Sequence, residues 1–422
     1  MNKTAHVLIC ALLLLVACDE EKDLHSDLVE LDVLMPADTT GIWHRLFEEF
    51  HSEHPRIRVR FVEGPSATNT REDLYVTSFL SGDSPYDLVY ADIPWVPKFA
   101  AAGWIVDLTD RWPEEAWNRF IDASVDGSTY RDRIFSVPMT IDAGMLYYRK
   151  DLLSAAGETP PRTFDELVDT ALRLQDPPEL WGFVWQGKQY EGLVCDYLEV
   201  LHGYGGFWID AESRRIGLGS PAADALDFLR KTIHEWEISP PGTTTYAEEE
   251  SRQLFQSGRA LFHRNWPYVW TLAQQEGSPI RGKVGFVPMP RTARGEHAAA
   301  LGGWGFSIAT QSPHAEEAWT FIDWMSRLSR TKRLHNSYGV SPALKEFYLE
   351  SEDPAIRSFY EIYRSAVPRP PIPQYAQASD ILQRHVSSAL TGRAGTEQAL
   401  AGAREETRLL LGEDESNHGA ER

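Results

Sequence analysis

Apolar and polar positions follow two alternating periods along the first part of the chain. Residues 29–35 form an apolar run of strand length, and residues 42–50 repeat large apolar side chains at helical spacing. Residues 57–61 then alternate apolar residues with arginines, which is the period of a strand with one face in water. The first sixty residues therefore predict the order strand, helix, strand.

Strands and helices continue to alternate over the rest of the chain, which is typical of the α/β class. The pattern predicts a helix over 71–80, a buried strand over 87–92, an apolar strand-like crossover over 137–151, a helix behind the capping box 163–166, a strand over 181–187, helices that open at 190 and 220, an aromatic-rich segment over 260–270, a helix after 312–313, an extended segment over 367–371 and closing helices over 379–390 and 396–411.

Length and composition limit the classes of protein to which the chain can belong. Its 422 residues, 42% hydrophobic and 24% charged, suffice for two domains with separate cores. The formal net charge of −21 argues against nucleic acid or anionic lipid as the main partner, because such partners require a basic surface. Three cysteines are too few for a disulfide framework or a zinc site.

The N-terminus carries a leader pattern. Lys3 precedes an apolar run over 7–16 that is too short to span a bilayer, and the run ends in Leu-Val-Ala-Cys at Cys18. This ending resembles the bacterial lipoprotein processing box, which implies a signal peptide over 1–17, an acylated Cys18 and an acidic tether over 18–27. Asp19 resembles the inner-membrane retention signal of some lipoproteins. An ordinary leader with a chance cysteine is the alternative.

Two carboxylates stand where apolar runs end. Asp142 lies in the crossover just before Gly144, and Asp92 ends the run 87–92. Because an unpaired buried charge is costly, Asp142 predicts either an ion pair with a core arginine or a carboxylate that faces a ligand. Ligands of open α/β sheets gather at the carboxyl ends of strands, so Asp92 predicts a ligand contact, with helix capping near Pro94 as its alternative.

Aromatic residues are concentrated in two short segments. Trp266 stands before a proline, which favours an extended or turn conformation. Trp304 is surrounded by glycines, and Gly303 among them would let the backbone approach a ligand closely. These indoles predict ring platforms for a ligand, with simple packing under a loop as the alternative.

The candidate side chains suit a neutral sugar. Sugar rings have apolar faces that lie on aromatic rings, and their hydroxyl groups pair with carboxylates and guanidinium groups. The candidates are the rings of Trp266, Tyr268 and Trp304 and the polar groups of Asp92, Asp142, Arg71 and Arg369.

Standard catalytic motifs are missing from the sequence, and no metal or cofactor is predicted. His51 and His54 share helical spacing, but they stand beside Pro55 and indicate a solvated helix end rather than a metal site. A glycoside hydrolase that uses Asp92 and Asp142 as acid and base is the main enzymatic alternative, since such enzymes need only two carboxylates.

Several longer segments resemble family 1 extracellular solute-binding proteins of ABC sugar importers, and specifically the trehalose/maltose-binding branch. They are spread over the chain in family order and are WGFVWQGKQYEGLVCD (181–196), the DAG-LYYRKDLL pattern (142–153), RNWPY (264–268), LGGW (301–304) and AVPRP (366–370).

The resemblance implies the two-lobe periplasmic binding protein fold of type II, with lobes joined by a multi-strand hinge that close on a disaccharide such as trehalose or maltose. The expected limits are 28–138 with 290–335 for lobe I and 139–289 with 336–412 for lobe II, followed by a disordered tail over 413–422. The expected protein is not an enzyme; it is a monomer that faces the periplasm or exterior from the inner membrane and delivers its sugar to permease subunits.

In relatives, residues matching Asp92 and Asp142 bind hydroxyls, those matching Trp266, Tyr268 and Trp304 stack, and those matching Arg71 and Arg369 add hydrogen bonds. Two positions depart from the family. Relatives have an acidic residue in the first loop, where this chain offers only Asp38 nearby, and an aromatic residue where Thr140 stands. The departures leave sucrose, palatinose or glucosylglycerol open as ligands. A peptide- or metal-scavenging lipoprotein is disfavoured by the many indoles.

Overall fold

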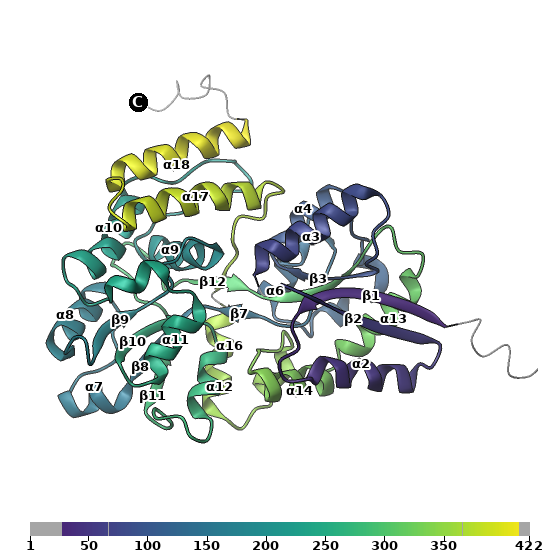
Figure 1. Ribbon diagram of the computed structural model, residues 1–422, viewed down its shortest axis with the longest axis horizontal. Helices are drawn as coiled ribbons and strands as arrows, with labels where there is room; N and C mark the ends of the chain where they lie inside the picture. Colours follow the sequence, from purple (N-terminus) through teal and green to yellow (C-terminus); the bar gives the residue numbers. More distant parts are fainter. Residues whose placement is uncertain (1–27, 66, 365, 413–422) are drawn as a thin grey trace, which may run out of the picture. The chain divides into compact units, whose positions relative to one another are not determined.

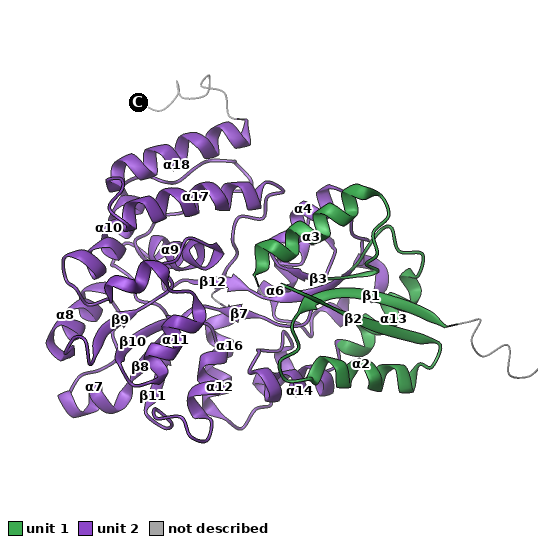
Figure 2. Cartoon of the chain, viewed as in Figure 1, with its two compact units in different colours: residues 1–90, 308–325 green, residues 91–307, 326–422 purple. Residues whose placement is uncertain are grey.

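The computed structural model describes residues 28–65, 67–364 and 366–412. The predicted leader, Cys18, the tether and the tail over 413–422 lie outside these residues. The chain forms two compact units, residues 1–90 with 308–325 and residues 91–307 with 326–422 (Figure 2). The lobe limits expected from the sequence stay a prediction.

The first unit confirms the order that the alternating periods predict. Its elements are β1 (Val29–Pro36), α2 (Ile42–Glu53), β2 (Ile57–Gly64), α3 (Thr68–Ser81) and α13 (Ala315–Met325), together with the first part of β3 (Leu88–Asp92). Strand β1 pairs in parallel with β2 on one side and with β3 on the other. Helix α2 buries its predicted apolar face, on which Phe47 meets Phe321 of α13 edge to face at 5.2 Å.

The second unit holds most of the remaining elements (Figure 1). They are α4 (Trp95–Ala101), η1 (Thr109–Arg111), α5 (Glu114–Trp117), α6 (Asp122–Asp126), β4 (Thr129–Tyr130), β5 (Arg133–Ile134), β6 (Val137–Pro138), β7 (Asp142–Ala143), β8 (Met145–Arg149), α7 (Lys150–Ala156), α8 (Phe164–Leu174), β9 (Trp181–Val184), α9 (Glu191–Gly203), α10 (Ser220–His234), η2 (Pro241–Thr245), α11 (Glu248–Gln256), β10 (Ala260–Asn265), α12 (Tyr268–Gln274), β11 (Val284–Val287), β12 (Ala299–Gly302), α14 (Leu328–Tyr338), α15 (Lys345–Leu349), α16 (Pro354–Arg364), β14 (Ala366–Val367), α17 (Tyr375–Leu390) and α18 (Thr396–Leu411).

Two sheets of this unit position the candidate site. One has the order β11-β8-β10-β9, and the other has the order β14-β12-β7. In the second sheet β12 runs parallel to β14 and antiparallel to β7, with Gly302 opposite Asp142. Strand β13 (Trp304–Ile308) follows β12 after one residue and pairs with β6, with Gly305 opposite Pro138. The turn at Gly303 therefore links both pairings.

The predicted crossover over 137–151 is divided into β6, β7 and β8, and Gly144 marks one of the divisions. A Cβ atom at Gly144 would lie 1.9 Å from Glu199 Oε1 and 2.3 Å from Arg264 Nη2. No side chain fits in this space. The glycine lets the backbone pass close to a buried ion pair, which the apolar pattern of the segment does not reveal.

Helix α9 is the central helix of the second unit. Buried residues make up 11 of its 13 positions, and α10 and α17 pack against it (Figure 1). Such all-round burial is expected for a helix enclosed by other helices and strands. Helix α17 begins at Tyr375, four residues before the predicted start at Ser379, because residues 374–378 mix polar and small side chains and give no apolar period.

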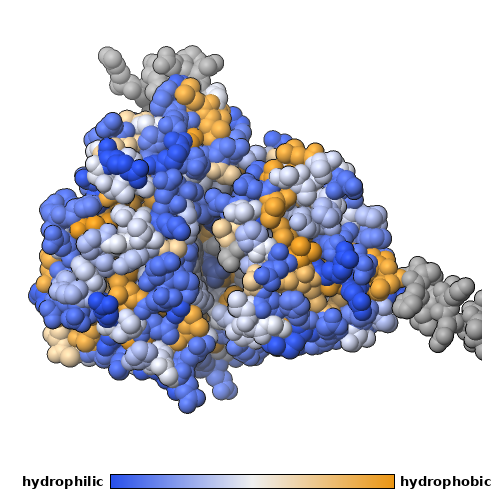
Figure 3. Space-filling model, in the orientation of Figure 1, coloured by the Kyte–Doolittle hydropathy of each residue, from blue (hydrophilic) through white to orange (hydrophobic). Residues whose placement is uncertain are grey.

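Hydrophilic residues predominate over the visible helices of the second unit (Figure 3). Exposed large apolar side chains are scattered, and Leu409 on α18 is one of them, with 63% of its surface exposed. Among residues 28–65, 67–364 and 366–412, none of the helices combines the length and apolar character that crossing a membrane requires.

Candidate functional site

Seven of the nine predicted ligand-binding residues lie in the second unit. They are Asp92 at the end of β3, Asp142 in β7, Trp266 between β10 and α12, Tyr268 at the start of α12, Gly303 and Trp304 at the β12–β13 turn, and Arg369 after β14. The other two, Asp38 and Arg71, lie in the first unit.

Asp142 and Trp266 lie beside each other because Gly302 separates them without a side chain. A Cβ atom at Gly302 would stand 3.3 Å from Asp142 Cβ and 3.5 Å from Trp266 Cζ3. Strand pairing places Gly302 directly opposite Asp142. A carboxylate and an indole, 124 positions apart in the sequence, therefore share one small region of the second unit.

The Asp142 carboxylate makes no hydrogen bond or ion pair with any residue in the described part of the chain. Burial, and to a smaller extent the nearby charge of Asp92, together raise its pKa to about 7. The alternative that Asp142 is paired with a core arginine is wrong. The side chain thus keeps its capacity to accept hydrogen bonds from a ligand, and it titrates close to neutral pH.

Asp92 is tied to Arg369. Arg369 Nη2 donates to Asp92 Oδ1 at 3.2 Å, and Arg369 Nη1 donates to Glu191 Oε1 at 2.8 Å. The guanidinium group is almost fully buried, yet its Nε has no hydrogen-bond partner in the described part of the chain. One arginine therefore joins the end of β3 to the start of α9 and still has a donor available.

Trp266 confirms the prediction of a non-helical position, since it stands between β10 and α12. Its ring is half-buried, and one face is covered by the Arg264 guanidinium group, 4.2 Å from the ring centre. The indole Nε1 contacts Glu248 Oε1 at 3.4 Å, and the backbone N–H donates to Asn265 Oδ1 at 2.7 Å. The ring is thus fixed from one side and at its edge.

Arg264 is itself held by a buried polar cluster. Its Nε and Nη2 donate to the two oxygens of Glu199 at 2.6 and 2.5 Å, and Nη1 donates to Gln186 at 3.0 Å. Asp196 Oδ1 lies 2.8 Å from Nε. Burial raises the pKa of Asp196 well above its ordinary value even though Arg264 lowers it. Glu199, which accepts two hydrogen bonds from Arg264, is therefore its main partner in the cluster.

Trp304 sits at a turn that only glycine can complete. Gly303 has φ +149°, and a Cβ atom there would lie 2.6 Å from the carbonyl oxygen of Thr140. Trp304 N–H donates to Thr140 Oγ1 at 3.1 Å, and its ring meets Trp95 edge to face at 5.5 Å. Thr140, which departs from the family pattern, thus has a backbone contact with Trp304.

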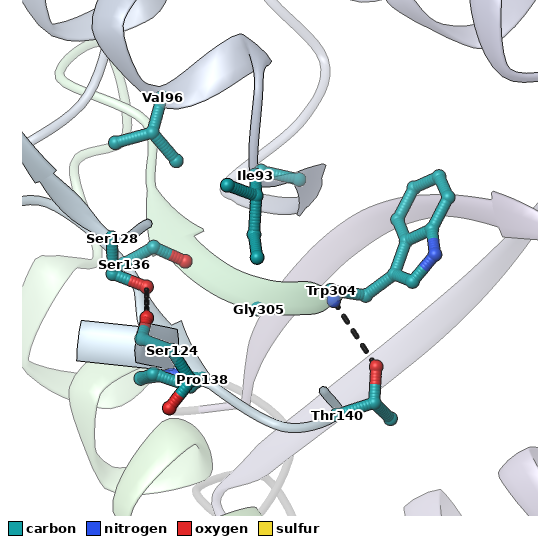
Figure 4. A pocket seen from close by; sticks show the side chains of 10 residues that line it. Ile93, Val96, Ser124, Ser128, Ser136, Pro138, Thr140, Trp304 and Gly305 are labelled. Carbon is teal, nitrogen blue, oxygen red and sulfur yellow. Dashed lines mark hydrogen bonds between the residues drawn. The ribbon is translucent and has the colours of Figure 1, made fainter. Parts of the chain in front are cut away.

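A small pocket lies behind the backbone of Trp304, and Figure 4 shows its indole directed away from the serines of this pocket. Ser124, Ser128 and Ser136 line one side, and the Ser128 hydroxyl donates to the Ser124 carbonyl at 2.9 Å. The lining atoms leave no room even for a water molecule. The pocket therefore cannot hold a sugar.

Tyr268, Asp38 and Arg71 already have partners. Tyr268 donates its hydroxyl to Glu249 Oε1 at 2.8 Å. Asp38 accepts the N–H of His44 in the first turn of α2 at 3.0 Å, and Arg71 donates to the Pro65 carbonyl oxygen at 2.7 Å. These contacts fix the three side chains, and their predicted ligand contacts stay predictions.

The sequence reasoning assigned no role to Glu191, Glu199 or the side chain of Arg264. Glu191 and Glu199 belong to the segment 181–196 and its continuation in α9, where charged residues stand inside an apolar run. A charge in such a run requires a buried partner. That signal could have identified the two carboxylates, although it could not have identified the arginines.

Comparisons with known proteins point to one family. The family described as bacterial extracellular solute-binding protein matches residues 36–327. A probable ABC transporter-binding protein of Deinococcus radiodurans is 33% identical over 356 residues, which cover 81% of this chain and 84% of that protein.

Two solved structures are similar over nearly the whole chain. Maltose-bound MalE3 of T. maritima is 36% identical with a TM-score of 0.85, and the match covers 91% of this chain and 100% of that one. An ABC transporter solute-binding protein of Thermotoga lettingae with bound α-D-tagatose is 26% identical with a TM-score of 0.81, at the same coverage. The predicted two-lobe α/β fold is confirmed.

Proposed function

We propose that this chain, which belongs to the family of bacterial extracellular solute-binding proteins, captures a neutral disaccharide such as trehalose or maltose for an ABC transporter. The relatives support the sugar class, since MalE3 was solved with maltose and the T. lettingae protein with tagatose. Permease subunits are the expected partners, and the protein acts as a monomer without cofactor or catalysis.

The single observation that carries the proposal is that Trp266 and Asp142 lie on either side of Gly302, which has no side chain to fill the space between them. One face of the indole is covered by Arg264, so a sugar would stack on the other face. The Asp142 carboxylate has no partner in the described part of the chain and would accept hydroxyl hydrogen bonds. A flat apolar surface beside an unsatisfied acceptor matches the two kinds of surface that a sugar ring presents.

The remaining predicted residues complete the proposed site. Asp92 and the unpaired Nε of Arg369 would bind further hydroxyls, and Trp304 at its turn and Tyr268 at the start of α12 would add ring contacts. Gly303 would let the backbone approach the ligand. Arg71 and Asp38 are proposed as additional polar contacts. The sugar would favour a closed conformation because it binds that conformation more tightly.

A thermal-shift screen tests the proposal. Bound ligand raises the melting temperature by mass action, so at least one of trehalose, maltose, sucrose, palatinose and glucosylglycerol should raise it in a concentration-dependent manner. Isothermal titration calorimetry then gives the affinity. D-Tagatose and a tripeptide mixture serve as the monosaccharide and peptide controls. A protein that responds to none of the sugars contradicts the proposed function.

A glycoside hydrolase is the second candidate, and one observation favours it: Asp142 titrates near neutral pH with Asp92 close by, as an acid and its partner would. Against it, Asp92 already forms an ion pair with Arg369, whereas a catalytic base must accept a proton from water. Incubation of the protein with trehalose and maltose, followed by an assay of free glucose, separates the two functions. Sustained release of glucose would favour the enzyme.

We further propose that Cys18 anchors the protein to the outer face of the cytoplasmic membrane. The support is the leader pattern and the extracellular family to which the chain belongs. A chain with acylated Cys18 should sediment with membranes, and Cys18→Ser should release it into the soluble extract. If the serine variant stays in the membrane fraction, lipidation is not the anchor.

A further inference from the structure

Glu191 is surrounded by donors from two other segments of the second unit. It lies in the first turn of α9 and accepts hydrogen bonds from Arg369 Nη1 at 2.8 Å, from Ser379 Oγ at 2.5 Å and from the Tyr375 hydroxyl. Two of these donors belong to α17 and the third follows β14. One carboxylate at the start of α9 thus binds donors that lie 178 to 188 positions further along the chain.

Helix α17 has a buried row of three polar side chains, two of which donate to Glu191. Tyr375, Ser379 and Gln383 are four residues apart, so they share one face of the helix. Their exposed fractions are 4, 2 and 6%, and Gln383 Nε2 donates to Ser379 Oγ at 2.9 Å. Burying polar groups costs stability unless they are all paired. The hydrogen bonds from Tyr375 and Ser379, and the one from Gln383 to Ser379, therefore fix the position of the Glu191 carboxylate.

The distances show which carboxylate holds Arg369. Arg369 lies closer to Glu191, at 2.8 Å, than to Asp92, at 3.2 Å, and it contacts Asp92 through one nitrogen and one oxygen. The ring of Tyr375 lies 5.9 Å from the guanidinium carbon and restrains it from another side. Glu191 therefore balances the attraction of Asp92 for Arg369.

We infer that Glu191 is a positioning residue of the sugar site: it holds Arg369 so that its Nε, which has no partner in the described part of the chain, stays available to a ligand hydroxyl. The inference rests on the proposed function. Without the charge of Glu191, the arginine would be drawn toward Asp92, which it contacts only through Nη2, and its Nε would move with it. The donor proposed for the sugar would then no longer point to the same position.

A double-mutant cycle tests whether Glu191 acts through Arg369. Glu191→Gln should weaken binding of the sugar found in the screen about tenfold, which is the usual effect of losing a charged hydrogen bond in a site. In an Arg369→Met background the same substitution should change affinity less than about twofold, since the group it positions is gone. Glu397→Gln, an exposed change in the first turn of α18, is the matched control and should have no effect.

A second readout needs no sugar. The side-chain N–H signal of Arg369 Nε, assigned by its loss in Arg369→Met, should shift in Glu191→Gln and stay in place in Glu397→Gln. If Glu191→Gln does not fold, Tyr375→Phe and Ser379→Ala each remove one donor to Glu191 and should shift the same signal and weaken binding two- to fivefold, within the roughly 1 kcal/mol of a neutral hydrogen bond.

The outcomes separate the inference from the proposed function. If the wild-type protein binds none of the sugars, the proposed function fails and the inference fails with it. If the wild-type protein binds a sugar but Glu191→Gln weakens binding equally with and without Arg369, or leaves the Arg369 signal unchanged, the inference alone is overturned. A loss of affinity that disappears in the Arg369→Met background supports it.

Discussion

Arg264 and Arg369 are both buried in the second unit beside two carboxylates, but only one of them has its donors satisfied. Arg264 donates to both oxygens of Glu199 and to Gln186. Arg369 makes single contacts with Glu191 and Asp92, and its Nε has no partner in the described part of the chain. Arg264 therefore supports the ring of Trp266, whereas Arg369 keeps one donor that no described residue binds.

The two arginines differ in whether all of their donors are used, and this difference should decide whether breaking the pair affects folding or binding. A satisfied buried pair should affect folding when it is broken, and it should affect binding only through the ring that it supports. A pair with unused donors and acceptors should affect binding directly. The predictions below test this difference, beginning with the largest effect.

Breaking the Arg264 cluster should cost the most stability. Glu199→Gln removes the firm counter-charge of a fully buried guanidinium group, and leaving a buried charge unpaired costs about 3–5 kcal/mol. Urea unfolding, followed by circular dichroism, measures the change. The control Glu397→Gln, which removes an exposed charge, should change the free energy of unfolding by less than about 0.5 kcal/mol. Equal values for both variants would refute the structural role of the cluster.

A smaller loss is expected when a methyl group is forced against the same cluster. Gly144→Ala places a Cβ atom where Glu199 and Arg264 already lie, and such overpacking costs about 1–3 kcal/mol. Gly395→Ala is the control, because nothing lies within 4 Å of its Cβ position and it precedes α18. Its cost should stay below about 1 kcal/mol. An alanine at 144 that is tolerated as well as one at 395 would contradict the described packing.

Asp142 should make stability depend on pH. Its pKa is raised in the folded protein from 3.8 to about 7, so folding favours the protonated form. The stabilisation that protonated Asp142 contributes is therefore fully present below about pH 4, and it is lost as the pH rises through 7. Because the residue is partly exposed, the loss is about 1–2 kcal/mol. Asp142→Asn should remove it, so that at pH 8 the variant is the more stable protein.

Thermal unfolding between pH 4 and 8 measures this effect, with the wild type and Asp142→Asn in parallel. A wild-type protein whose stability relative to the variant rises from pH 5 to 8 would show that Asp142 is ionised and paired after all.

Sugar affinity should show the opposite trend with pH and the smallest effect. Hydroxyl donors favour the ionised carboxylate of Asp142, so binding should weaken by up to about 1 kcal/mol as the pH falls from 8 to 6. Calorimetry in two buffers of different ionisation enthalpy should detect release of up to one proton near pH 7. Identical heats in both buffers would exclude a direct contact between Asp142 and the sugar.

The sequence predicts the local elements well where burial follows a regular period. Helix α2 and strand β2 have one buried face each, and Trp266 stands where Pro267 forbids a helix. The candidate residues Asp92 and Asp142 stand out because each is a charge at the end of an apolar run. These features depend on neighbours within a few residues, which the pattern records.

The sequence does not predict the partners of the buried charges. Arg264 and Glu199 are 65 positions apart, and Arg369 and Glu191 are 178 apart. Helix α9 is buried all round, so its pattern has no polar face to show which residues meet a partner. The pairs arise only when the sheets bring β10 and the segment after β14 against α9, and that packing depends on the whole fold.

Calorimetric titration of Trp266→Ala with the sugar found in the screen tests the central claim most directly. Loss of a stacked ring should weaken binding by about 1–3 kcal/mol relative to the wild type. Trp236→Ala, which removes an indole that packs on Phe228, controls for the loss of a ring elsewhere and should leave affinity unchanged. Undiminished affinity in folded Trp266→Ala would contradict the account, because the indole beside Asp142 would then not be the surface on which the sugar lies.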